Sequence, residues 1–78
     1  MAAQLAPAIT HAERVRGNET QLEWLGVPEG ERPELAVKLS SALCEQIVEL
    51  RAILGNDVSE EATAAKVALI AAVRVLLR

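Results

Sequence analysis

Residues 59–78 read SEEATAAKVALIAAVRVLLR, and this stretch decides the fold class. Asp57 or Ser59 is placed to cap a helix here, and two glutamates follow in the first turn, where carboxylates favour the positive end of the helix dipole. Two arginines stand near the opposite end, where cations are favoured. The sequence therefore predicts a helix over about residues 59–77.

This predicted helix is apolar around nearly its whole circumference. At about 100° per residue, its larger side chains form one stripe and its alanines form a second stripe beside it. The larger stripe contains Leu69, Ile70, Val73, Leu76 and Leu77, and the second contains Ala64, Ala65, Ala68, Ala71 and Ala72. A helix that is apolar nearly all round is a buried helix. A chain of 78 residues has too little mass to surround one, so we expect a second copy to cover the remaining apolar surface.

A second long helix is predicted over about residues 33–54. Pro33 suits its first turn, where the missing N–H costs nothing, and Gly55 with Asn56 favours an end after Leu54. The polar strip of this helix is narrow, and most of its circumference is apolar. Because the connection to the next helix is short, the two helices are expected to form an antiparallel hairpin.

Two shorter helices are predicted before this hairpin, over about residues 7–16 and 19–25. Gly17 and Asn18 tolerate the left-handed conformation that ends a helix, and this separates the two. A loop with two prolines and a glycine covers residues 27–33. No stretch alternates as a strand would. The prediction is a single all-α domain over residues 1–78, a small helical bundle that we expect to be completed by self-association.

Pairs of such hairpins would form a four-helix core between two copies of the chain. Small side chains let two helix backbones approach closely, whereas larger ones fill the centre. The candidate oligomer interface consists of Leu43, Ile47 and Leu50 from the first hairpin helix and Ala64, Ala68, Ala71, Ala72 and Val75 from the second.

Composition and charge exclude several classes of protein. Half of the chain is apolar (51%), which argues against disorder. The formal net charge is −3 and basic residues are not clustered, so no nucleic-acid partner is expected. Cys44 is the lone cysteine, which excludes a disulfide scaffold.

The sequence is not expected to contain a membrane-spanning segment or a signal peptide. Its longest charge-free apolar run, residues 67–73, is far shorter than the roughly 20 residues that span a bilayer. The first residues lack the basic segment and the long apolar core of a signal peptide. Together with the single cysteine, these features favour a reducing, cytoplasmic compartment and no membrane partner.

Candidate contacts with a partner or an anion come from the basic and aromatic residues. His11 lies near Arg14 and Arg16 on one predicted helix. It is either a surface histidine without a binding role or, with the two arginines, a contact for an anion or a partner. Arg74 and Arg78 are four residues apart, so they either complement the helix dipole or hold a phosphate or carboxylate. The only aromatic residue is Trp24, either a core residue under a short helix or an exposed anchor for a partner.

The sequence contains few residues in patterns that indicate catalysis. Glu45 and Glu49 share a helix face, as do the carboxylates that hold magnesium in helical-bundle hydrolases, but a solvated face explains them equally. Cys44 has no close cation to activate it and is interpreted as a small apolar residue. None of the nucleotide, metal or nucleophile motifs occurs. No enzymatic activity, cofactor or metal is therefore expected.

The function predicted from these features is that of a non-enzymatic helical interaction protein. It would act as an inhibitor, adaptor or chaperone-like protein that binds a larger protein partner as a homo-oligomer. An oligomer that binds or sequesters a small anion or nucleotide through its arginines is the alternative. A metal-dependent helical-bundle hydrolase that uses Glu45 and Glu49 is the second alternative.

Overall fold

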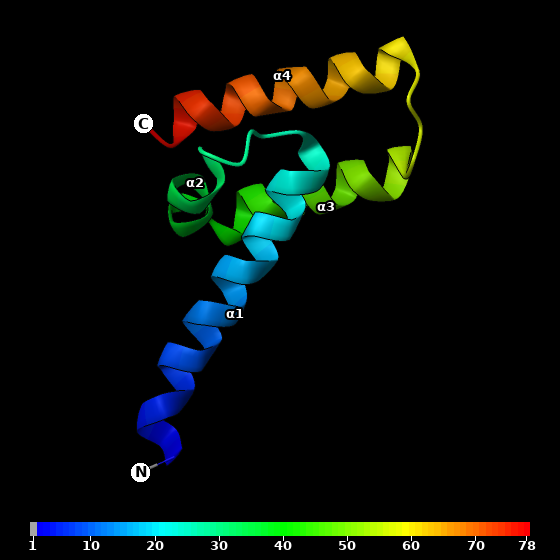
Figure 1. Cartoon of the computed structure of the whole chain (residues 1–78). Helices are drawn as coiled ribbons and strands as arrows, with labels where there is room; N and C mark the ends of the chain where they lie inside the picture. The colour runs from blue at the N-terminus through cyan, green and yellow to red at the C-terminus, as the bar shows by residue number, and fades with distance from the viewer. Residues whose placement is uncertain (1) are drawn as a thin grey trace.

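Four helices make up the part of the chain that the computed structural model describes, which is the backbone of residues 2–78 and the side chains from residue 10 onward. They are α1 (Ala2–Leu25), α2 (Arg32–Lys38), α3 (Ser41–Leu54) and α4 (Glu60–Leu76), as Figure 1 shows. No strand occurs among these residues. The prediction of an all-α chain is confirmed.

The first helix, α1, is continuous, so the prediction of two separate helices over 7–16 and 19–25 is wrong. Asn18, expected to end a helix, lies within α1 and is only 2% exposed. Its Nδ2 donates to the carbonyl oxygens of Ala36 at 2.9 Å and Leu39 at 3.2 Å. The Asn18 side chain thus satisfies the carbonyls at the end of α2, while its backbone stays helical.

The predicted helix over 33–54 is in fact two helices, α2 and α3, with a break between them. Leu39 adopts an extended conformation there, with φ −63° and ψ 121°, and its side chain is buried. Ser40 then caps α3, because its hydroxyl accepts the Leu43 N–H at 3.2 Å. The break leaves carbonyl oxygens without helical N–H donors, and the Asn18 amide donates hydrogen bonds to two of them. The buried interruption is stabilised in this way.

The fourth helix, α4, forms where the sequence predicts it. The Ser59 hydroxyl accepts the Ala62 N–H at 3.2 Å, so Ser59 is the cap. Asp57 supports the turn instead, because its Oδ1 accepts the Ser59 N–H at 2.8 Å. Hydrogen bonds from the Ser59 backbone and hydroxyl lower the pKa of Asp57 below its ordinary value. Of the two capping candidates, Ser59 therefore caps α4, and Asp57 stabilises the turn that precedes it.

The hydrophobic core gathers around the C-terminal half of α1. Its buried members are Leu22, Leu25, Val27, Leu35, Ala36, Leu39, Ile47 and Val73. The α1 helix packs mainly against α2 and α3, whereas α4 makes few contacts with either α1 or α3. The end of α1 and the loop after it lie between α3 and α4 (Figure 1). The close hairpin expected from the sequence, with α3 and α4 in direct contact along their length, is therefore not what the single chain shows.

The N-terminal half of α1 projects away from the other helices (Figure 1). The side chains of residues 10–14 on this part are all exposed. The projection contributes to an elongated shape, with principal extents of 51 × 25 × 20 Å.

Candidate functional site

The α4 helix presents two apolar faces with opposite surroundings. One face is turned to the core. On this face Ala62 and Val73 are buried, and Leu69 and Ile70 are partly buried and pack against the core. The other face, called here the outer face of α4, is exposed along the helix. It consists of Ala64, Val67, Ala68, Ala71, Ala72 and Val75. Leu76 borders it and is exposed as well.

No part of the described chain covers the outer face of α4. The helix forms one edge of the molecule, and α1, α2 and α3 all lie on its other side (Figure 1). The six side chains of the face are apolar, and charged residues stand only at its ends. Glu60 and Glu61 are exposed at the start of the helix, and Arg78 is exposed just beyond its end. The face is therefore an apolar strip with opposite charges at its two ends.

A second exposed apolar surface lies where α3 turns into α4. Ile53 is 79% exposed and Val58 is 89% exposed, and these two residues are called here the α3–α4 tip. Trp24 anchors the turn between them, because its Nε1 donates to the Gly55 carbonyl oxygen at 3.2 Å. The tip thus extends from a turn that is tied to α1.

Trp24 is half-buried and packs against the core, with its polar atom engaged inside the chain. The ammonium of Lys66 lies 4.4 Å from the centre of its ring, and the guanidinium of Arg51 lies 5.9 Å away. Such cations are attracted to the ring face. In this structure the side chain joins α1, α3 and α4 at the border of the core.

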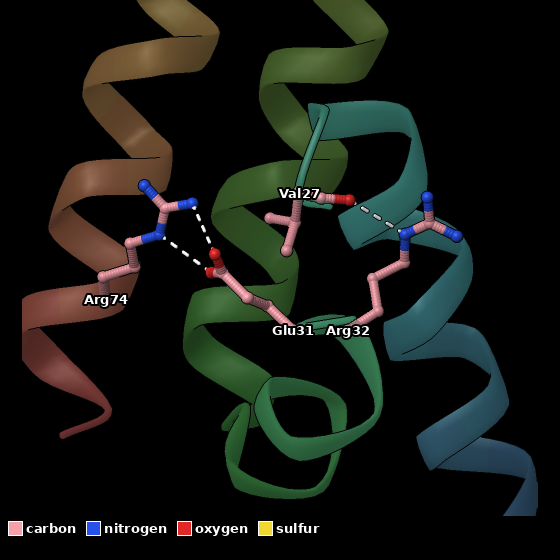
Figure 2. A network of polar contacts seen from close by, with 4 residues as sticks. All are labelled: Val27, Glu31, Arg32 and Arg74. Atoms are coloured by element: carbon pink, nitrogen blue, oxygen red, sulfur yellow. Dashed lines mark hydrogen bonds and ion pairs between the residues drawn. The ribbon is translucent and has the colours of Figure 1, made fainter. Parts of the chain in front are cut away.

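Arg74 is engaged within the chain as well. Its Nε and Nη2 donate to the two carboxylate oxygens of Glu31, both at 3.0 Å, and Figure 2 shows this pair. Arg32, next to Glu31, donates from Nε to the Val27 carbonyl oxygen at 2.9 Å and holds the same loop from the other side (Figure 2). Arg74 therefore docks the loop after α1 onto α4. Arg78 has no ion pair among the residues whose side chains are described.

The basic residues of α1, His11, Arg14 and Arg16, are exposed in the single chain. Arg14 lies with Nη2 3.4 Å from Nδ1 of His11. Arg16 lines an open cavity of about 410 Å³ between α1 and the start of α2. The other lining residues are Glu19, Thr20, Glu23, Glu29, Arg32 and Pro33. Three carboxylates against two guanidinium groups do not favour an anion there, and Arg74 is paired elsewhere.

The structure divides the candidate oligomer interface into two groups. Ile47 is fully buried in the core of the single chain, and Leu43 and Leu50 pack against that core. In the single chain, Ile47 thus lies in the interior, and Leu43 and Leu50 lie at the border of the core. The other group, the alanines with Val75, lies on the outer face of α4.

Two exposed features escaped the sequence analysis. Val67 belongs to the outer face of α4, and its spacing of three from Ala64 and four from Ala71 was a usable signal. The α3–α4 tip has no such periodic signal, because Val58 stands in a turn and Ile53 lies on the side of α3 that α1 leaves open.

The residues weighed for chemistry remain scattered. Glu45 and Glu49 are exposed on α3, and no group of three or more metal-ligating side chains gathers within the described residues. Burial, with a smaller contribution from the charge of Glu45, raises the pKa of the Cys44 thiol above its ordinary value. A raised pKa keeps the thiol protonated and weakly nucleophilic near neutral pH.

The fold and these surfaces define a small all-α protein with two exposed apolar surfaces, the outer face of α4 and the α3–α4 tip. Comparison with family models, with curated proteins and with solved structures finds no match for this chain. None of the helices in the described part of the chain is long and apolar enough to cross a membrane.

Proposed function

We propose that this protein is a non-enzymatic helical interaction protein that self-associates and binds a larger protein partner. The observation that carries the proposal is the extent of exposed aliphatic surface on a chain of 78 residues. Contiguous exposed apolar surface on a small protein is typical of sites that bind other proteins. The outer face of α4 is such a surface, and the α3–α4 tip adds two further exposed aliphatic side chains.

The α3–α4 tip suits a partner because its two aliphatic side chains are almost fully exposed on an anchored turn. Trp24 ties the turn to α1 through Gly55, and the Asp57 carboxylate accepts the Ser59 N–H within it. A surface that is already ordered loses less conformational entropy on binding. Ile53 and Val58 are therefore proposed as the contacts with the larger partner.

Affinity capture from the native host tests this function. The tagged full chain is compared with the double variant Ile53→Glu, Val58→Glu and with Ala12→Glu, an exposed control on α1. We expect the parent and the control to retain the same protein and the tip variant to lose it. Calorimetry with that protein in purified form should then show the same order of affinities. Equal retention by the tip variant, or no protein retained above background, would contradict the proposal.

A thermal-shift screen separates this function from the ligand-binding alternatives. The expected result is an unchanged melting temperature with nucleotides, both with and without magnesium. A shift with nucleotides alone would instead favour an anion-binding oligomer, and a shift that requires magnesium would favour a metal-dependent hydrolase.

A further inference from the structure

We propose that the outer face of α4 binds the same face of a second copy, with the two α4 helices antiparallel and Glu61 of each copy beside Arg78 of the other. The inference rests on the proposed self-association and adds the surface, the orientation and the residues that set it. Three observations support it: the spacing of the apolar residues, the distribution of their volumes and the placement of the charges.

The spacing of the outer face follows a heptad pattern. Ala64, Ala68, Ala71 and Val75 are separated by four, three and four residues, the repeat by which one helix keeps a single side toward another. All four are exposed, and α1, α2 and α3 lie on the other side of the helix (Figure 1). A second helix can therefore lie along this face without displacing any part of the described chain.

The volumes along the outer face are self-complementary in an antiparallel pair. About a midpoint between Leu69 and Ile70, the two central alanines, at 68 and 71, stand opposite each other. The same midpoint places Val75 opposite Ala64 and Val67 opposite Ala72. Each valine thus faces an alanine, and small residues face each other at the centre, where the backbones come closest. A two-fold interface requires this reciprocal relation, in which the same patch serves both copies.

The charges select the antiparallel orientation. The midpoint that matches the volumes also places Glu61 opposite Arg78, so both ends of the pair join opposite charges. Both side chains are exposed, and neither has an ion pair among the residues whose side chains are described. In a parallel pair, Glu61 would instead lie beside Glu61 of the second copy, and Arg78 beside its Arg78. Like charges in contact are destabilising, which disfavours that arrangement.

Arg74 does not disturb the apolar strip, although it lies at its border. Its guanidinium is turned to Glu31 in the loop after α1 (Figure 2). The outer face therefore carries charge only at its ends, and the second copy meets an uncharged centre.

The first test measures mass with purified full chain by size exclusion with light scattering at micromolar concentration. We expect the parent at about twice its monomer mass of 8.4 kDa. Ala68→Leu should raise the dissociation constant at least tenfold, because a large side chain at the centre forces the backbones apart. The control Ala12→Leu, exposed on α1, should leave it unchanged. A monomeric parent would contradict self-association itself, whereas a dimer insensitive to Ala68→Leu would overturn only the choice of surface.

The second test addresses orientation through the end charges. Glu61→Arg and Arg78→Glu should each raise the dissociation constant about tenfold, because each creates two like-charge contacts in a symmetric dimer. The double variant should return close to the parent value, since the opposite charges are then restored with exchanged positions. An effect on the helix dipole alone would make the double variant weaker than either single variant. Either that order, or no effect of the single variants, would overturn the antiparallel pairing.

Discussion

Val73 and Val75 are the same amino acid, two residues apart on α4, but their side chains differ completely in burial. Val73 is completely buried, whereas Val75 is 59% exposed. Val73 belongs to the core cluster together with Leu22, Leu25 and Val27, while Val75 belongs to the outer face of α4. Both faces of α4 are apolar, but the rest of the chain covers only the side that carries the larger side chains.

Isoleucines on α3 show the same contrast, with Ile47 in the core and Ile53 at the α3–α4 tip. One side of each helix completes the interior of the chain, and the other side remains as apolar surface. The buried sides stabilise the chain, and the exposed sides are those proposed above to contact other molecules. Substitutions of matched residues on the two faces test this division directly.

The largest effect is expected for Ile47→Ala, which removes a buried side chain from the core. It should lower the free energy of unfolding by about 2–5 kcal/mol, because a cavity adds to the lost burial. Ile53→Ala, on the exposed side of the same helix, should change it by less than about 0.5 kcal/mol. Urea unfolding at one fixed protein concentration measures both. Similar losses for the two variants would contradict the assignment of the α3 faces.

The valine pair on α4 gives the next effect. Val73→Ala should cost about 2 kcal/mol of unfolding free energy, whereas Val75→Ala should leave the stability of the dilute chain within about 0.5 kcal/mol of the parent. The measurement is thermal unfolding followed by circular dichroism, at concentrations below and above dimer dissociation. A loss for Val75→Ala that occurs only at high concentration would sharpen the comparison, because it would locate the contribution of Val75 between two copies.

Asn18 is the exception to the division, since it is a polar residue on the inner side. Asn18→Ala should cost about 1–3 kcal/mol, because the carbonyls of Ala36 and Leu39 would lose their donor inside the core. The neighbouring Gly17→Ala should act in the opposite direction by about 0.5–1 kcal/mol. Gly17 is helical, and no atom lies within 4 Å of an added Cβ, so alanine would only favour the helix. Chemical unfolding that showed no loss for Asn18→Ala would contradict its role.

The smallest effect concerns Cys44, at the border of the core. Because its thiol pKa is raised in the folded chain, the stabilisation is fully present below the pKa of the unfolded thiol, near 9.0, and is lost as pH rises through the folded value. Unfolding free energy should therefore decline at alkaline pH more steeply for the parent than for Cys44→Ala. Parallel pH profiles from pH 7 to the alkaline range would show that this thiol does not contribute.

Part of the fold was accessible from the residues because it depends on neighbours along the chain. The start of α4 follows from Ser59 and the two glutamates after it, and the end of α3 follows from Gly55, which adopts a positive φ of 55°. Four alanines on α4 were likewise predicted as surface for another chain, and the structure leaves all four exposed: Ala64, Ala68, Ala71 and Ala72. These are local or periodic properties, so they can be read without knowing which segments meet.

Other features depended on contacts across the chain and could not be read in this way. Gly17 and Asn18 have the residue types of a helix end, yet α1 continues through them because Asn18 finds its acceptors in α2. The break at Leu39 occurs in a segment with good helical periodicity and is stabilised by the same amide. Both departures have one cause, a pair of hydrogen bonds between residues far apart in the sequence.

By itself, the sequence determined that the chain is helical, that α4 begins at its serine cap, and that more apolar surface exists than one small chain can bury. The alanine stripe of α4 was part of that predicted surface, but only the tertiary structure decided that Leu43, Ile47 and Leu50 would pack in or against the core of the single chain and that Ile53 and Val58 would be exposed. The end of α1 and the loop behind it occupy the space between α3 and α4, and Arg74 holds this loop through Glu31. Because the burial of a helix face requires a partner elsewhere in the chain, the packing of this loop and of the end of α1 determined how the bulky stripe of α4 is covered, and the alanine stripe remained exposed.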